Sequence, residues 1–295
     1  MKNTTSTKNT AVTASAASAL TASIIEGVKN IRSTKEWAEM LKFQTGFWEY
    51  SWHNQLLIWL QTNGTARKVA GFQTWKKKGT CVKKGEKAIK ILAPIISKKK
   101  DEKTGEEKPV LVGFKVVNVF DIAQTTQGTL PSVWHRSEKE DEKAIGLVNK
   151  IKKLSYVHEL SASAHEEGSY SPMSGRINIK FSDKANALVE TFVHEYCHKM
   201  IHEDLKAEEG LKNLDHAMEE IVVESASYIL CTLAGIDVEA SAFSYVACWL
   251  NNGDKDDKEV ENALKEITKV ANTAAKSLEE QGINLLPAMA PVEAE

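Results

Sequence analysis

The chain has 295 residues, 42% hydrophobic and 26% charged, so it is long enough for one large or two ordinary domains with a real core. Its four cysteines are widely spaced without a Cys-x-x-Cys pair, which disfavours a disulfide framework and favours reduced thiols. No apolar run is long enough to span a bilayer, and the Thr/Ser-diluted stretch 11–25 lacks the compact apolar centre of a signal peptide. These features predict a cytoplasmic protein that has no membrane partner.

The small net charge of −2 conceals two oppositely charged halves. Residues 1–137 contain 22 Lys/Arg and 10 Asp/Glu, whereas the remainder contains 16 Lys/Arg and 30 Asp/Glu. Such asymmetry predicts two domains with different partners, because a basic half attracts a polyanion that an acidic half repels.

The first half of the chain changes from a helical to a strand-forming pattern. Residues 1–22 are rich in Thr, Ser, Ala and Asn and are expected to be disordered. From residue 25 to 61 large apolar side chains recur at three-to-four spacing, which predicts helix. Strand patterns bounded by turn residues follow, and a charged hairpin loop at 98–108 precedes the last of them. The predicted strands span residues 69–75, 88–96 and 110–120.

The second half is predicted to be mostly helical. Pro131 and the charge run after it predict a linker between domains. Beyond the linker, residues 168–181 predict a hairpin or an edge strand, and helical periodicity dominates elsewhere. The predicted helices span residues 142–154, 185–202, 218–233, 240–250 and 260–278.

These elements predict an α+β chain in which a basic α+β module precedes a mostly helical domain with a small sheet. The expected division is a disordered N-terminus (1–22), a first domain (23–130), a linker (131–141), a second domain (142–280) and a tail (281–295).

The sequence His194-Glu195-Tyr196-Cys197-His198 carries the most specific chemistry. Two histidines four residues apart lie on one face of a helix and can bind one zinc ion, and the glutamate between them can act as general base on a zinc-activated water. The pattern predicts metal-assisted peptide-bond hydrolysis. The alternative is that these polar side chains are ordinary exposed residues of a surface helix. The apolar residues that precede the motif argue against it, because they predict a largely buried helix, and buried polar side chains need partners.

A catalytic zinc needs a third protein ligand. His202 lies two helical turns beyond His194, about 12 Å along the axis, so the two cannot share one ion and His202 is expected to be a neighbour. The helix at 218–233 offers glutamates on the flank of its apolar face. Glu220 with Glu224 one turn later resembles the thermolysin-like gluzincins, in which the second carboxylate holds a ligating histidine. We therefore predict Glu220 as the ligand and Glu224 in that supporting role, with Glu219 as the rival ligand.

The segment from residue 67 to 90 contains nine basic residues and one acid, with aromatic rings between them. Such a composition suits single-stranded nucleic acid, because Lys and Arg pair with phosphates while bases stack on rings. The equally weighted alternative is a solvated lysine-rich hairpin in which the tryptophan is core. The candidate DNA-binding residues are Arg67, Lys68, Phe72, Trp75, Lys76, Lys77, Lys78, Lys83, Lys84 and Lys87.

Several multi-residue motifs in this order resemble the ArdC-type antirestriction proteins, and the second half is more distantly similar to ImmA/IrrE-type metallopeptidases. The resemblance covers most of residues 25–250. The motifs that carry it are Tyr50-Ser51, Asn54-Gln55-Leu56-Leu57-Ile58, Gln61, Val69-Ala70-Gly71-Phe72, Trp75, Val82 to Lys87 and Val119 to Thr125.

The resemblance implies a single-stranded DNA-binding N-terminal domain joined to a gluzincin-like zinc peptidase with one ion. It also implies a role on mobile elements, where such a protein protects incoming DNA from restriction during conjugation. By the same resemblance, His194, His198 and a glutamate within residues 219–224 hold the metal. Two other functions stay open: a non-catalytic protein that coats DNA around a structural zinc site, and a peptidase that cleaves a repressor.

Overall fold

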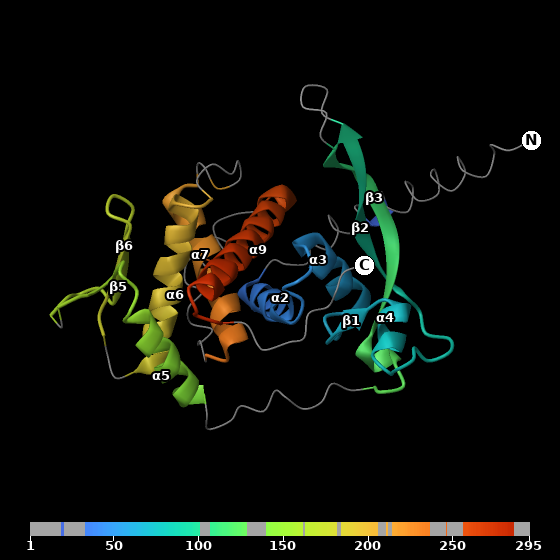
Figure 1. The fold of residues 1–295 in the computed structure, drawn as a ribbon, viewed down its shortest axis with the longest axis horizontal. Coiled ribbons are helices and arrows are strands. Elements are labelled where there is room, and N and C mark those ends of the chain that lie inside the picture. The colour runs from blue at the N-terminus through green and yellow to red at the C-terminus, as the bar shows by residue number, and fades with distance from the viewer. Residues whose placement is uncertain are drawn as a thin grey trace, which may run out of the picture. The chain divides into compact units, whose positions relative to one another are not determined.

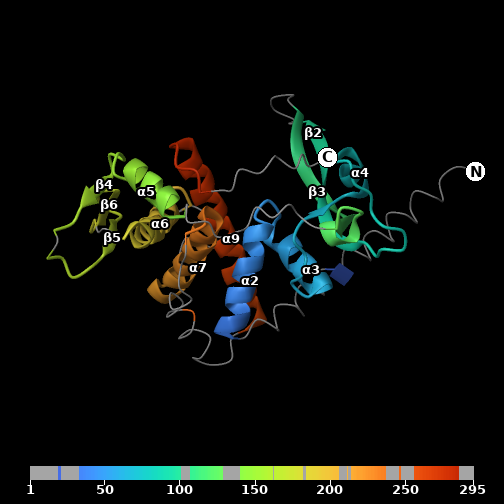
Figure 2. The same ribbon diagram turned by 90° about the horizontal axis from the view of Figure 1, so that it is seen from below.

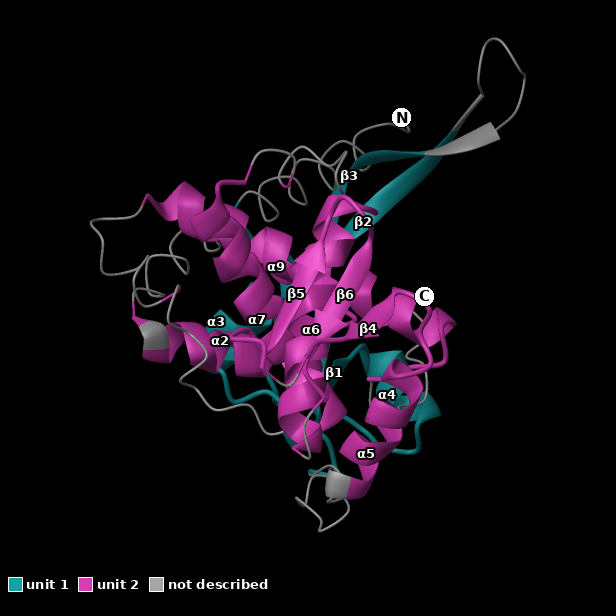
Figure 3. Ribbon diagram, turned by 90° about the vertical axis from the view of Figure 1, so that its left-hand side faces the viewer, with its two compact units in different colours: residues 1–30, 53–133 teal, residues 31–52, 134–295 magenta. Residues whose placement is uncertain are grey.

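The computed structural model describes residues 19–20, 33–100, 107–128, 140–161, 163–181, 184–205, 211, 214–236, 246 and 256–285. The chain divides into two compact units, coloured separately in Figure 3. Unit 1 comprises residues 1–30 and 53–133, and unit 2 comprises residues 31–52 and 134–295. Both mix helices with a small sheet, and unit 2 is mostly helical, so the predicted α+β class is confirmed.

Unit 1 is built on a long two-stranded ribbon (Figure 1). The ribbon pairs β2 (Ile89–Lys100) with β3 (Glu107–Asp121), so the predicted loop at 98–108 is shorter than expected. Strand β1 (Val69–Ala70) adds to β3, giving the order β1-β3-β2. The predicted strand at 69–75 is wrong beyond Ala70, because Gly71 is the N-cap of a short helix, α4 (Phe72–Lys77).

Helix α3 (Trp52–Thr62) protects the outer edge of β2 with two amide side chains. Asn54 accepts from the Leu92 backbone N–H at 2.9 Å and donates to its carbonyl at 2.8 Å. Two turns later on the helix, Gln61 makes the same pair of bonds with Lys90, at 2.9 and 2.8 Å. The amides take the place of a neighbouring strand and satisfy an edge that would otherwise be open to pairing.

A buried carboxylate organises the corner where β3 ends. Asp121 is 5% exposed and accepts backbone N–H groups from Arg67, Lys68 and Ala123. It forms a capping box with Gln124 at the start of the 3₁₀ helix η1 (Ile122–Gln124). The corner therefore joins β1, β3 and η1 through one charged residue.

Unit 2 contains a three-stranded sheet and five described helices. The sheet has the order β4-β6-β5, with β4 (Val157–Glu159) parallel and β5 (Gly168–Ser171) antiparallel to β6 (Arg176–Ile179). The predicted hairpin at 168–181 is confirmed, whereas β4 was not expected. The described helices are α2 (Thr34–Gly46), α5 (Glu140–Ile151), α6 (Ala185–His202), α7 (His216–Ala234) and α9 (Asp257–Glu280).

The core of unit 2 lies where α7 packs against α2, α6 and α9 (Figure 2). Trp37 of α2 is fully buried, and its indole N–H donates to Ser225 of α7 at 3.0 Å. Helix α7 begins at the N-cap Asp215 and ends at Gly235, whose φ of 74° is the left-handed conformation that favours glycine. The caps define the ends of α7, and its packing against α6 brings together the polar side chains between the two helices.

Within the described part of the chain, no helix combines the length and apolarity needed to cross a membrane. The predicted helix at 240–250, most of the predicted linker, and most of the predicted N-terminal and C-terminal tails lie outside the described residues.

Candidate functional site

Helix α6 carries the histidine motif on one face and core residues on the other. Its apolar face is buried, and even Cys197 inside the motif is fully buried, with its thiol pKa raised by burial. His194, Glu195 and His198 lie on the half-buried side. The buried side chains that anchor α6 are Leu188, Val189, Phe192, Val193, Tyr196, Cys197, Met200 and Ile201.

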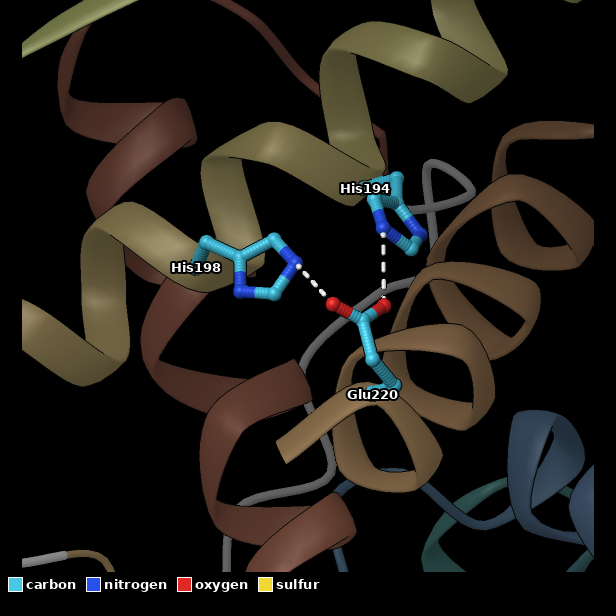
Figure 4. Close-up of side chains that lie close together, drawn as sticks. All are labelled: His194, His198 and Glu220. Atoms are coloured by element: carbon cyan, nitrogen blue, oxygen red, sulfur yellow. Dashed lines mark ion pairs between the residues drawn. The ribbon is translucent and has the colours of Figure 1, made fainter. Parts of the chain in front are cut away.

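Helix α7 places Glu220 between the two histidines (Figure 4). The Nε2 atom of His194 lies 3.5 Å from one carboxylate oxygen of Glu220, and that of His198 lies 3.4 Å from the other. One ligand atom from each of the three residues lies within 4.8 Å of the others. Two imidazole nitrogens and a carboxylate oxygen are a donor set that zinc accepts in catalytic sites, so the residues present fit a metal ion.

The neighbouring glutamate holds His198 from the other side. Glu219 lies 2.6 Å from Nδ1 of His198 and 2.9 Å from Nε2 of His202 through the same oxygen. This is the arrangement that fixes the tautomer and orientation of a metal-binding histidine. Glu224, which is predicted to hold a ligating histidine, lies one turn beyond Glu220 on α7 and has a buried side chain. The contact on Nδ1 of His198 comes from Glu219, which lies in the first turn of α7.

His198, His202 and Glu219 form a second group whose ligand atoms also lie within 4.8 Å of one another. The two groups share the His198 ring, whose Nε2 faces Glu220 while its Nδ1 faces Glu219. Spacing along α6 had suggested His202 only as a neighbour. The signal that points to it is the series of histidines at 194, 198 and 202, which share one helical face.

Charges in this cluster are strongly coupled. Burial alone lowers the pKa of His198, but the carboxylates of Glu219 and Glu220 outweigh it and raise that pKa to about 9. Burial pushes the pKa values of both glutamates upward, and contacts with the histidines reverse the effect, so both lie below the usual range. Before a metal binds, His198 is therefore an imidazolium held between two carboxylates.

Glu195 faces the strand β5. Burial raises its carboxyl pKa against the opposing effect of His194 and His198, and the backbone N–H of Tyr170 donates to the carboxylate. A Cβ at Gly168 would lie 2.4 Å from Thr191 and 3.2 Å from Glu195, so only glycine allows β5 to approach α6 this closely. The resulting pocket of about 310 Å³ is lined by both elements and by α7.

Three residues, Tyr170, His216 and Tyr245, are expected from the sequence as candidate donors to a reacting carbonyl oxygen. Tyr170 lines the pocket, but its hydroxyl donates to Glu203 at 3.0 Å, and burial with that carboxylate raises its pKa. His216 also lines the pocket, is largely exposed, and has Nδ1 3.7 Å from Glu220. Tyr245 lies outside the described residues.

The predicted DNA-binding residues all lie in unit 1, and Trp75 is the one among them whose side chain is buried. The basic side chains are exposed except Lys68, which is half-buried, and Phe72 is 50% exposed. Trp75 is 2% exposed and donates from its indole N–H to the Phe120 carbonyl at 2.8 Å. Trp75 packs with Ala70 and Ile122, so its ring is core and is corrected from a base platform to a structural residue.

Comparison with known proteins gives two family matches in this order along the chain. Residues 14–120 match the N-terminal domain of anti-restriction factor ArdC. Residues 155–266 match the zincin-like metallopeptidase family MPTase-PolyVal and contain the histidine motif together with Glu219 and Glu220.

Individual relatives are more distant. An uncharacterized protein of Bacillus anthracis is 27% identical over 297 aligned positions, covering 84% of this chain and 48% of that protein. The chain thus spans about half the length of this curated relative. Crystal structures of the antirestriction ArdC protein from plasmid R388, metal-free and Mn(II)-bound, are 22% identical with a TM-score of 0.47. The alignments cover 78% and 80% of this chain and 86% of theirs.

The resemblance carried by the motifs is therefore confirmed: the chain combines a segment that matches the ArdC N-terminal domain with a zincin-like metallopeptidase domain.

Proposed function

We propose that the chain is a DNA-associated zinc metallopeptidase that acts against restriction. Its unit 1 binds single-stranded DNA, and its unit 2 hydrolyses peptide bonds. The observation that carries the enzymatic half is the convergence of His194, His198 and Glu220 on one point, with Glu195 beside it in the same pocket. Neither the helix spacing nor the family match alone would require that convergence.

In this proposal His194, His198 and Glu220 hold one zinc ion. A zinc ion held there would polarise the scissile carbonyl and lower the pKa of the attacking water toward ~7. Glu195 accepts the proton of that water and then delivers it to the leaving amine. The raised pKa of Glu195 suits this task, because a base whose pKa lies closer to the working pH both takes and returns a proton efficiently.

Strand β5 supports a peptide as the substrate. It is an edge strand of its sheet, and it borders the pocket through Gly168, Ser169 and Tyr170. An extended peptide can add to such an edge through backbone hydrogen bonds, which would place its carbonyl groups beside Glu195.

The basic surface of unit 1 supports single-stranded DNA as the other partner. Between residues 67 and 90 nine basic residues accompany one acid, and all but Lys68 among them are exposed. This density of exposed positive charge attracts phosphates by releasing their counterions. The match of residues 14–120 to the N-terminal domain of an anti-restriction factor supports protection of entering DNA from restriction, the role that we propose for this chain on a mobile element.

The decisive variant is Glu195→Gln, which removes the base but leaves the proposed ligands. We expect peptide hydrolysis by the zinc-loaded full chain, assayed on unfolded casein, to fall about 10²- to 10⁴-fold. Bound zinc, measured by elemental analysis, should remain stoichiometric. Glu280→Gln is the matched control, because Glu280 is an exposed glutamate on α9.

The same variants separate the competing functions when they are tested for protection of incoming DNA in a restricting host. Loss of protection in Glu195→Gln alone supports a catalytic role. Full protection by Glu195→Gln would leave the DNA-coating function, with the metal site only structural. If wild type cleaves a repressor of the element and Glu195→Gln abolishes that cleavage without changing protection, the chain acts as a repressor peptidase.

A further inference from the structure

Exposed large apolar side chains concentrate on the β2–β3 ribbon. Of nine such side chains among the described residues, six lie on this ribbon and a seventh, Phe72, lies beside it on α4. A soluble surface does not gather apolar groups in one place without a partner. The six ribbon residues are Ile95, Ile96, Val110, Leu111, Val112 and Phe114.

Strand alternation assigns the residues of the ribbon to two faces. Ile89, Ile91 and Val119 are buried and define the inner face. The outer face consists of the residues between them, because successive side chains point to opposite sides and directly paired residues share a side. On β3 the outer face carries Phe120, Asn118, Val116 and Phe114, and on β2 it carries Lys90, Leu92 and Pro94.

The outer face has an exposed ring near each end. Phe114 is 49% exposed and is paired with Pro94. At the other end Phe72 is 50% exposed and contacts Phe120 edge to face, with 6.4 Å between ring centroids. Six residues of extended strand separate Phe114 from Phe120, which is about 20 Å. Half-buried Val116 and exposed Lys90 and Asn118 lie between.

The charges around this face favour a polyanion over a protein. Within residues 53–98 and 110–128 the sequence has eleven Lys/Arg, against only Glu86 and Asp121. Asp121 is buried and occupied by backbone N–H groups, which leaves Glu86 as the exposed acid. Flat aromatic faces within a basic surrounding match nucleobases joined by phosphates.

We propose that the outer face of the β2–β3 ribbon is the base-stacking platform for single-stranded DNA, with Phe72 and Phe114 as the two stacking rings. This inference rests on the proposed DNA-binding function and assigns its surface. The strand lies along the ribbon with its bases against the outer face and its phosphates near the lysines. Paired bases are already stacked within a duplex, so the platform selects single strands.

The test measures binding of the full chain to a fluorescent twenty-nucleotide oligothymidine by anisotropy. Phe72→Leu and Phe114→Leu keep apolar bulk but remove a ring, and each should weaken binding about 5- to 100-fold. Phe114→Trp should bind as wild type, with indole fluorescence quenched on binding. Ile95→Ala is the matched control, because Ile95 is an exposed residue on the inner side of the same ribbon.

An abasic strand of equal length and charge separates stacking from electrostatics. Wild type should prefer oligothymidine, and Phe114→Leu should reduce this preference while keeping its affinity for the abasic strand. If wild type binds no single strand at low salt, the proposed DNA-binding function fails. If wild type binds and both leucine variants bind equally well, DNA binding stands and the assigned platform is wrong. The same conclusion follows if the leucine variants bind DNA normally but no longer self-associate, because the rings would then serve a contact between copies of the chain.

Discussion

The two polar regions of this protein are built in opposite ways. In unit 2, two histidines and two glutamates contact one another at 2.6 to 3.5 Å in a largely buried cluster. In unit 1, basic side chains are spread over the surface and mostly face solvent. A buried cluster depends on every member, since removing one leaves a charge without compensation, whereas a solvated surface depends on the sum of its charges. Single substitutions should therefore affect the two regions very differently.

The largest single-residue effect is expected at Glu220. Replacing it with Gln removes a proposed ligand, so zinc affinity should fall more than the roughly 10- to 100-fold typical of residues that only orient a ligand. The loss of zinc affinity in Glu219→Gln should lie within that roughly 10- to 100-fold range, because Glu219 only orients His198 from the side opposite to Glu220. Competition with a zinc chelator measures the zinc affinity of both variants, and Glu279→Gln is the control because Glu279 is exposed on α9. If only the Glu219 variant lost zinc, Glu219 would be the ligand and Glu220 the residue that orients a histidine.

A smaller effect, a dependence of zinc affinity on pH, follows from the interaction of His198 with the two glutamates. The pKa of His198 is raised to about 9 in the metal-free protein, so zinc must displace a proton at neutral pH. Zinc affinity should therefore rise about tenfold per pH unit between pH 7 and 9 and level off above. Chelator competition across this range checks the slope. In Glu219→Gln the levelling should begin at lower pH, because one carboxylate that raises the His198 pKa is gone, and an unchanged profile would contradict the coupling.

The smallest effect is expected for one lysine of unit 1. Lys78→Gln should weaken oligothymidine binding only a few-fold and reduce the slope of log affinity against log salt by about 0.7, the share of one phosphate contact on a single strand. Titrations at several salt concentrations measure both quantities, and exposed Lys276→Gln on α9 is the control. A loss as deep as that at Glu220 would mean that unit 1 also contains a strictly organised site.

Local patterns were sufficient for much of this structure, because they depend on period and spacing. The motif helix occupies the predicted residues 185–202, and Glu220 was selected from its place beside an apolar stripe. The contact of Glu219 with His198 and His202 depends on how α6 and α7 cross, which no local pattern records. Trp75 failed as a prediction for a similar reason, since composition does not show which ring in a basic segment is buried.

The motifs of the N-terminal resemblance teach a related lesson. Asn54 and Gln61 complete the edge of β2, Asp121 and Gln124 cap a corner, and Trp75 bonds the Phe120 carbonyl. These polar side chains stabilise the fold by satisfying backbone groups. Phe114, the ring placed on the outer face of the ribbon, lies outside every motif that carries the resemblance.

Helix α2 limits how this protein can be rearranged. It lies within the segment that matches the ArdC N-terminal domain, yet Trp37 bonds Ser225 and Gln44 bonds Thr268, both in the peptidase half. A break in the chain after the N-terminal match would leave three fully buried α2 residues, Trp37, Met40 and Leu41, without their packing partners. Recombination between relatives would therefore have to exchange α2 together with the peptidase half. The segment that can be exchanged as a unit thus begins at α2, before the end of the N-terminal match.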